Sequence, residues 1–346
     1  MEGKEELKVG SRKSELALIQ TGLVIDELKE LYPHKKFDVV TMSTIGDQIL
    51  DRPLPKIGEK SLFTKELETA LLENKVDFLV HSLKDMPTSL PDGLAIGAIL
   101  RREDPRDAVI LHKKHRGQTL ETLPPKSIIG TSSLRRTAQL KRKFPHLIIK
   151  DIRGNLQTRR EKLRKGDYDG IILAFSGMMR MGWEDAISQV LDENVMLYAV
   201  GQGALAVECR INDCAFFAPL NHKQSVFPTI AERSLLNTLG GGCSAPVAVS
   251  SKFSEGTLLL IAAVWSLDGS VTLQETLSQK ITNEELKDEP DEKRKENDLY
   301  CGMTVHGLEP LQVRLSHKLG VTLAQKLISE GALKIIEDAK TACMKS

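Results

Sequence analysis

Apolar and polar positions follow two different periods over the first 200 residues. Short apolar runs typical of β-strands alternate with longer runs, such as 14–31 and 61–75, in which apolar residues recur every three or four positions. The strand-like runs are residues 7–11, 37–44, 77–82, 94–100, 127–133, 147–152, 170–175 and 195–200. This alternation predicts an α/β architecture in which helices cover the faces of sheets.

The pattern changes after residue 225, where we expect a separate, smaller α+β domain. Its helix-like and strand-like runs are residues 229–239, 246–251, 257–266, 270–277, 311–329 and 332–342. Within it, segment 283–298 is dense in charge and poor in apolar residues, which predicts a solvated loop. Breaks that contain Pro or Gly, at 101–105 and 199–203, are candidate hinges.

Composition argues against two classes of partner. The 346 residues include 48 Lys and Arg against 47 Asp and Glu, and only 4% are aromatic. A formal net charge of +1 argues against a general polyanion binder, and so few aromatic residues argue against a surface that stacks bases. The apolar stretches fall well short of the roughly 20 residues of a membrane span. We therefore expect neither nucleic acid nor membrane as a partner.

The cysteines and the charged start of the chain predict a cytoplasmic location. Residues 1–8 lack the apolar core of a signal peptide. Five cysteines form an odd set without C-x-x-C spacing, which is typical of free thiols in a reducing compartment. We expect neither a disulfide framework nor a metal site.

Positive charge is concentrated between residues 131 and 165, which hold twelve basic residues and two acidic ones. A solvated helix face explains 141–143 and 160–165 equally well. The residues at strand ends are more informative, because hydroxyl and Arg side chains there precede helix-like runs. Free N–H groups at a helix N-terminus, together with Arg side chains, suit an anion.

Four strand–loop–helix junctions share this combination of Ser, Thr, Arg and Lys: 10–14, 82–85, 131–136 and 153–159. Ligands of open α/β sheets bind at the carboxyl ends of the strands. If the four junctions converge, they form a cleft with several carboxylate- or phosphate-sized anion sites. Arg side chains favour carboxylates, because their planar fork pairs with both oxygens.

Three further features remain open between a structural and a functional interpretation. Asp85 is either a turn cap or a carboxylate that stabilises a developing cation, whereas His81 is better explained as a packed strand residue. Cys243, on a loop opened by three glycines, is either incidental or a covalent attachment point. Segment 46–63 is either a connector or a lid that carries Lys60 and Phe63.

Nine motifs together resemble the porphobilinogen deaminase (hydroxymethylbilane synthase) family, and the charged insertion near 283–305 resembles its animal members. The motifs are GSRKSELA (10–17), STIGD (43–47), GEKSLFTKELE (58–68), VHSLKDMPT (80–88), GTSSLRR (130–136), DIRGNLQTR (151–159), RMGW (180–183), AVGQGAL (199–205) and GGCSAPVAV (241–249). The resemblance implies a transferase of heme and tetrapyrrole biosynthesis. Such an enzyme condenses four porphobilinogen molecules, with release of ammonia, into the linear tetrapyrrole hydroxymethylbilane.

The resemblance also implies a covalent cofactor and roles for the site residues. A dipyrromethane would be attached to Cys243 through a thioether, and Asp85 would stabilise the protonated pyrrole as ammonia leaves. The residues expected to hold the cofactor carboxylates are Lys84, Ser132, Ser133, Arg135 and Arg136. Those expected to bind the substrate and the growing chain are Arg12, Gln20, Arg153, Asn155, Arg159, Arg180 and Gln202. Lys60 and Phe63 would belong to a mobile loop over the cleft.

The implied fold has three domains. Two α/β domains that resemble periplasmic binding proteins, 1–102 with 200–224 and 103–199, would flank the cleft, and the α+β domain, 225–346, would carry the cysteine loop. The resemblance implies a monomer. Two alternatives stay open: a non-catalytic anion-binding protein, which would not need Cys243, and nucleic-acid binding through 131–165, which the lack of interleaved aromatic residues disfavours.

Overall fold

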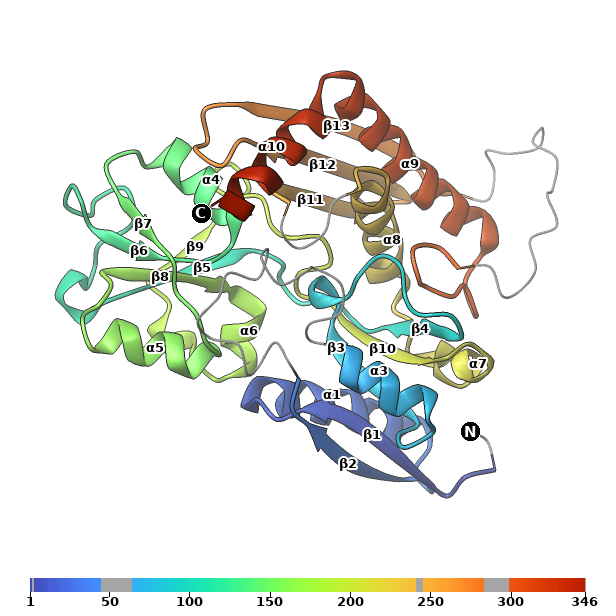
Figure 1. Cartoon of the computed structure of the whole chain (residues 1–346). Helices are drawn as coiled ribbons and strands as arrows, with labels where there is room; N and C mark the ends of the chain where they lie inside the picture. The colour runs from blue at the N-terminus through green and yellow to red at the C-terminus, as the bar shows by residue number, and fades with distance from the viewer. Residues whose placement is uncertain (2, 45–63, 241–244, 283–298, 346) are drawn as a thin grey trace.

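The computed structural model describes residues 1, 3–44, 64–240, 245–282 and 299–345, and three sheets organise them. The first sheet lies at the lower right of Figure 1 and has the order β2-β1-β3-β10-β4. Its strands are β1 (Glu6–Arg12), β2 (Lys36–Met42), β3 (Phe78–Ser82), β4 (Leu94–Ile99) and β10 (Leu205–Arg210). Strands β1, β2 and β3 are parallel, and β10 is antiparallel to both of its neighbours.

The second sheet, at the left of Figure 1, repeats this order as β7-β6-β8-β5-β9. Its strands are β5 (Asp107–Leu111), β6 (Ile128–Gly130), β7 (Ile148–Lys150), β8 (Gly170–Ala174) and β9 (Gln189–Leu191). Here β5 is the antiparallel fourth strand. The chain therefore crosses between the sheets twice, once before β5 and once before β10. Two α/β domains with the same strand order are thus joined by two crossing segments.

Helices cover both faces of the first sheet. Strand residues alternate between the two faces, so Phe78 and Val80 pack with α1 (Glu15–Leu31), whereas Leu79 packs with α3 (Lys65–Leu72). The Ser14 side chain caps α1 by accepting a hydrogen bond from the Ala17 amide. The remaining helices of the two α/β domains are α4 (Leu134–Lys143), α5 (Leu156–Arg164), α6 (Phe175–Arg180) and α7 (Cys214–Phe217).

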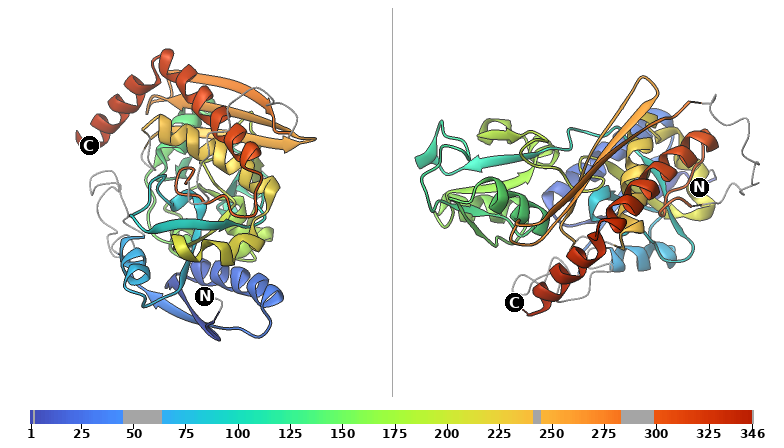
Figure 2. Two further views of the ribbon diagram at one scale, coloured as in Figure 1. Left: turned by 90° about the vertical axis from the view of Figure 1, so that its right-hand side faces the viewer. Right: turned by 90° about the horizontal axis from the view of Figure 1, so that it is seen from above.

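The third domain is an antiparallel three-stranded sheet packed against helices, and it lies above the other two in Figure 1. Its elements are α8 (Lys223–Thr238), β11 (Val247–Ser254), β12 (Thr257–Trp265), β13 (Thr272–Lys280), α9 (Pro310–Ser329) and α10 (Ala332–Lys345). Helices α8 and α9 cross closely at Gly320, where an added Cβ would clash with the Ala231 carbonyl oxygen. Figure 2 shows α10 projecting beyond the rest of this domain.

Most expected elements are present, and the exceptions have physical causes. Residues 195–200, expected as a strand, form one isolated bridge, between Tyr198 and Val249. Their apolar side chains are buried because this segment crosses between domains. Strands β5 and β10 were not expected, since a buried charged residue begins the apolar run of β5 (Asp107) and another interrupts that of β10 (Glu208). Strand β9 was missed as well, and α8 begins at Lys223 rather than at 229.

Candidate active site

The four junctions converge on one cavity of about 550 Å³, which meets the condition that the sequence analysis set for an anion-binding cleft. It lies between the first and second domains, at the carboxyl ends of β1, β3, β6 and β7. Its lining includes Arg12 and Ser14 from the first junction and Lys84 with Asp85 from the second. The other two junctions contribute Ser132, Arg136, Arg153, Gly154, Asn155 and Arg159.

The first domain supplies Arg12, Gln20, Lys84 and Asp85. Gln20 on α1 donates a hydrogen bond to the Ser82 hydroxyl at 3.0 Å, which ties the helix to the end of β3. Lys84 and Asp85 follow on the short helix η2 (Leu83–Asp85). The pKa of Lys84 is lowered to about 8, mainly by desolvation. Asp85 and Asp107 oppose this shift, whereas Arg136 and Arg135 contribute to it. Asp85 is exposed to the cavity.

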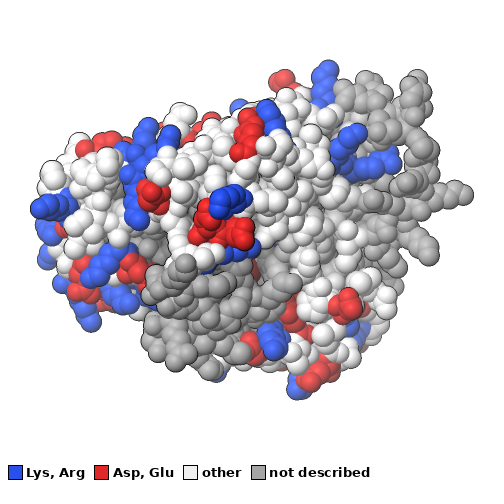
Figure 3. All heavy atoms as spheres, turned by 45° about the horizontal axis from the view of Figure 1, so that its top comes forward, with Lys and Arg blue, Asp and Glu red and all other residues white. Residues whose placement is uncertain are grey.

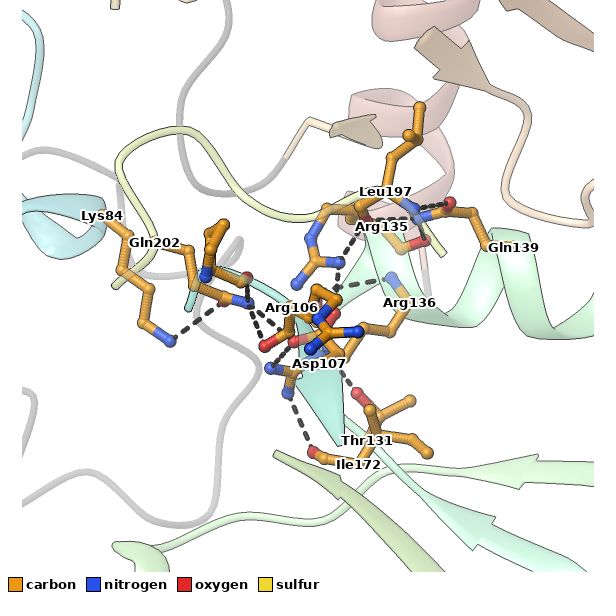
Figure 4. A network of polar contacts seen from close by, with 12 residues as sticks. Lys84, Arg106, Asp107, Thr131, Arg135, Arg136, Gln139, Ile172, Leu197 and Gln202 are labelled. Atoms are coloured by element: carbon orange, nitrogen blue, oxygen red, sulfur yellow. Dashed lines mark hydrogen bonds and ion pairs between the residues drawn. The ribbon is translucent and has the colours of Figure 1, made fainter. Parts of the chain in front are cut away.

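The β6–α4 junction places its two adjacent arginines differently. Arg136 lines the cavity, and its buried Nε atom has no hydrogen-bond partner in the described part of the chain. Arg135 is only 5% exposed and does not line the cavity; it donates to the Asp107 carboxylate and to the Leu197 carbonyl, both at 2.7 Å. Figure 4 shows both guanidinium groups directed at Asp107.

The hydroxyl groups of this junction hold the backbone. Ser133 caps α4 by accepting a hydrogen bond from the Arg136 amide at 3.4 Å, and Ser132 donates to the Ile152 carbonyl. Ser132 lines the cavity and Ser133 does not. Ser132 therefore joins the neighbouring loops after β6 and β7 at the cavity wall.

The β7–α5 junction depends on Gly154 and Asn155. Gly154 has a φ of +106°, which L-residues rarely adopt, and Asn155 caps α5 by accepting from the Thr158 amide at 2.9 Å. Arg153 pairs with Asp151, and the Arg159 Nε donates to the Gly154 carbonyl at 2.8 Å. Desolvation, followed by the charge of Arg136, lowers the pKa of Arg159 to about 10. The guanidinium groups of this wall therefore repel one another when the cavity holds no anion.

Arg180 and Gln202 join the site from α6 and from the second crossing segment. Arg180 lines the cavity and pairs with Glu103 at 2.9 Å, while it donates to the Gly203 carbonyl at 2.8 Å. Gln202 is fully buried behind the cavity, where it accepts from the Lys84 Nζ at 3.4 Å and donates to Asp107 at 2.9 Å. It does not line the cavity.

The expected site residues fall into three groups. The cavity gathers Arg12, Gln20, Lys84, Asp85, Ser132, Arg136, Arg153, Asn155, Arg159 and Arg180. It does not gather Ser133, Arg135 or Gln202, which lie behind its wall. Lys60, Phe63 and Cys243 fall outside the described residues. His81 is buried with its Nε2 3.0 Å from the Glu208 carboxylate, in keeping with a packed strand residue.

The sequence did not point to two carboxylates that hold the cavity arginines: Asp107, which binds Arg135 and Arg136, and Glu103, which binds Arg180. The signal for Asp107 is a charged residue at the start of an apolar run, RDAVIL. A buried carboxylate in such a position needs a cation, and Arg side chains are the usual partners. The sequence alone does not say which arginines these are.

The charge of the site defines its ligand class. Seven basic side chains line the described cavity wall, and Asp85 is the one carboxylate among them. On the face shown in Figure 3, by contrast, basic and acidic side chains are interspersed, with no continuous basic band. No described helix is both long and apolar enough to cross a membrane. Fold and site together define an α/β protein that binds a small ligand with several anionic groups between two domains.

Comparison with known proteins identifies the family. The sequence-family model described as "Porphobilinogen deaminase, dipyromethane cofactor binding domain" matches residues 7–217. A second family model, "Porphobilinogen deaminase, C-terminal domain", matches residues 227–296. The chain is 51% identical over 275 residues to Porphobilinogen deaminase of Synechococcus elongatus, which covers 79% of this chain and 86% of that protein. The chain belongs to the porphobilinogen deaminase family.

A second relative, Porphobilinogen deaminase of Nostoc sp., is 47% identical over 285 residues, which cover 82% of this chain and 88% of that protein. Both relatives are cyanobacterial, so they give no support to the expected likeness to animal members. Among solved structures, the Bordetella pertussis BvgS VFT2 domain matches with a TM-score of 0.40 and 12% identity, over 64% of this chain and 87% of that chain. The strand order of the two sheets, rather than this match, defines the fold.

Proposed function

We propose that this chain is the transferase that joins four porphobilinogen molecules head to tail into hydroxymethylbilane, releasing ammonia at each addition. The observation that carries this proposal is the convergence of four cationic junctions and Asp85 on one cavity in a member of this family. Each pyrrole of the substrate bears an acetate and a propionate. The growing chain is therefore a polycarboxylate, which suits a wall of seven basic side chains.

The residues fit a dipyrromethane cofactor attached to Cys243. Arg136 has a buried Nε without a partner in the described residues, and desolvation lowers the pKa values of Lys84 and Arg159. A buried cation that lacks a hydrogen-bond partner, or whose pKa is lowered by desolvation, is stabilised when a carboxylate binds beside it. The cofactor would supply the pyrrole end to which the first substrate unit is joined. Lys84, Ser132 and Arg136 would bind its carboxylates, with Ser133 and Arg135 supporting them from behind.

The substrate and the growing chain would be held by Arg12, Arg153, Arg159 and Arg180, with hydrogen bonds from Gln20 and Asn155. These residues lie on both walls, so they can grip successive acidic arms. Gln202 would act from behind the wall, through Lys84. Lys60 and Phe63 stay predictions for a loop over the cavity.

Asp85 is the proposed catalytic residue. It is the one carboxylate among the described lining residues, whose other charged side chains are all cationic, and it is exposed to the cavity. A carboxylate there can stabilise the positive charge that develops on a pyrrole nitrogen when ammonia departs. It can also accept or return a proton within hydrogen-bond reach of the bound ring.

We extend the proposal to the organisation of the chain: domains at 1–102 with 200–224, 103–199 and 225–346, acting as a cytoplasmic monomer. The membership of β10 in the first sheet supports the split first domain. The odd set of five cysteines supports a reducing compartment. Light scattering of the purified protein measures the molar mass, and a dimer mass would contradict the monomer.

The test of the function is an intact mass combined with an assay of product. The active protein should exceed its sequence mass by one dipyrromethane and should convert porphobilinogen to hydroxymethylbilane. Cys243→Ser should lose both the added mass and the activity, whereas the matched control Cys301→Ser should keep them. A protein that binds anionic ligands without added mass or product would instead be the non-catalytic anion-binding alternative.

A further inference from the structure

Asp107 lies behind the cavity, at the point where the chain enters the second sheet after its first crossing. Its side chain is 0% exposed and meets three partners. Its Oδ2 accepts from Arg135 at 2.7 Å, and its Oδ1 accepts from Arg136 at 2.7 Å and from Gln202 at 2.9 Å. Figure 4 shows Asp107 at the centre of this network.

Asp107 holds the two arginines against their mutual repulsion. Burial alone would raise the pKa of its carboxyl group, but the charges of Arg135 and Arg136 hold that pKa well below its ordinary value. Two guanidinium groups against one carboxylate leave one positive charge uncompensated. Only Arg136 lines the cavity, so this charge faces the ligand.

The two arginines therefore have different tasks. Arg136 also donates to the Ile172 carbonyl at 2.9 Å, which fixes its guanidinium group against the middle of β8. Arg135 turns away and donates to the Leu197 carbonyl, which also accepts from Gln139 at 3.0 Å. Arg135 thus anchors the second crossing segment to α4.

Gln202 connects Asp107 to the opposite wall. It belongs to the second crossing segment, and its amide donates to the Pro105 carbonyl of the first crossing segment at 2.6 Å. Its side-chain oxygen accepts from Lys84 of the first domain at 3.4 Å. Lys84, Gln202, Asp107 and Arg136 thus form a continuous polar bridge behind the cavity, and only its two ends line the wall.

We propose that Asp107 is a positioning residue that orients Arg136 directly and Lys84 through Gln202, so that the two domains present these cations to ligand carboxylates at a fixed separation. This role deepens the proposed transferase function and rests on it for the class of ligand. Asp107 does not touch the ligand. Its charge also favours the protonated form of Lys84, since it is one of the groups that raise the Lys84 pKa.

The first experiment is the pH dependence of turnover in Asp107→Asn. Loss of the carboxylate should raise KM about tenfold, and it should move the alkaline decline of kcat/KM, which we assign to Lys84, to lower pH by roughly half a unit or more. Asp107→Glu should move the decline back toward the wild-type value. A role in stability alone would not shift this decline.

The control is Asp104→Asn in the same crossing segment. Asp104 pairs with Arg106 and has no contact with the bridge, so the wild-type pH profile should persist. Gln202→Met provides a second variant, because it cuts the link to Lys84 without removing a charge. It should raise KM and shift the decline in the same direction, even if Asp107→Asn does not fold. A wild-type KM and profile in Gln202→Met, or in folded Asp107→Asn, would overturn the proposal.

A binding measurement separates this proposal from the transferase function. In full-length Cys243→Ser, citrate serves as a tricarboxylate probe, and calorimetry measures its affinity. Adding Asp107→Asn should weaken binding about tenfold, whereas adding Asp104→Asn should not. Unchanged citrate affinity would contradict the positioning role. Failure of the wild-type protein to form product would contradict the transferase function and leave this comparison intact.

Discussion

Lys84 and Arg159 are cations whose burial outweighs the effect of nearby carboxylates on their pKa values. Desolvation lowers the pKa of Lys84 to about 8 and that of Arg159 to about 10, from ordinary values of 10.5 and 12.5. Both groups therefore lose their protons at a lower pH in the folded protein than they would when surrounded by water. Binding of a carboxylate reverses the effect, since an adjacent negative charge favours the protonated form. Occupancy of the cavity and the charge of its wall are therefore linked.

This linkage predicts how turnover depends on pH. Lys84 is mostly charged below about pH 8 and loses its proton above that value, so the affinity for carboxylates should fall as pH rises from 7 to 9.5. In Lys84→Arg, the guanidinium group stays charged, and the rise of KM over this range should flatten. Steady-state kinetics at fixed ionic strength measure both profiles. Lys113→Arg, on an exposed residue of the short helix η3 (Lys113–His115) that follows β5, is the control and should match the wild type.

At Asp85 we expect the chemical step to fail without loss of structure. Asp85→Asn keeps the size of the side chain but removes its charge and its ability to accept a proton. Turnover should fall by about 10²-fold or more, while the denaturation midpoint and the added cofactor mass stay near wild-type values. The exposed Asp92→Asn is the control. Near-normal activity of Asp85→Asn would remove this residue from the catalytic role.

The elements that build the site are strand–loop–helix junctions, and Gly154 is the most constrained position among them. Its φ of +106° strains any L-residue, and an added Cβ would lie 2.6 Å from the Thr158 side chain. Gly154→Ala should displace the start of α5 and lower the free energy of unfolding by about 1–3 kcal/mol. Because Arg153 and Arg159 flank this turn, KM should rise as well.

Gly166→Ala is the matched control for this change. Gly166 also has a positive φ, +88°, but an added Cβ there would have no neighbour within 4 Å. Chemical denaturation should show a loss of stability from backbone strain, while KM stays at the wild-type value. Equal effects of the two variants on KM would show that the turn at Gly154 does not shape the site.

Local patterns were sufficient to predict these junctions, because hydroxyl groups, basic residues and a following helix occur within a few positions of one another. They were not sufficient for Asp107, whose partners Arg135 and Arg136 lie 28 and 29 positions further along the chain. Buried charges also concealed strands: Glu208 lies within β10, next to His81 of β3. Burial of a charge becomes explicable only when its distant partner is known.

At the scale of the whole molecule, Glu232 on α8 of the third domain binds both crossing segments. Its side chain is fully buried and binds Arg102 of the first crossing segment through both oxygens, at 2.7 and 3.1 Å. It also accepts from the Gly201 amide of the second crossing segment at 2.8 Å and from Ser251 of β11 at 2.5 Å. The third domain therefore holds both crossings in place.

Glu232→Gln should weaken this junction strongly, because it leaves Arg102 buried without a charged partner. We expect a loss of about 3–5 kcal/mol in the free energy of unfolding and faster proteolysis of the two crossing segments. The exposed Glu255→Gln in the same domain should change neither quantity. Intact crossing segments in Glu232→Gln, under protease conditions that leave the wild type whole, would show that the junction does not depend on this carboxylate.

The position of β10 has a consequence for synthesis on the ribosome. The second sheet uses only strands between Asp107 and Leu191, whereas the first sheet needs Leu205–Arg210 between β3 and β4. A nascent chain can thus close the later sheet before the earlier one. The amino-terminal part must wait, with the edges of β3 and β4 unpaired by their final neighbour, until more than 200 residues have left the exit tunnel. A pause in synthesis at that stage would leave the unpaired edges of β3 and β4 accessible to chaperones.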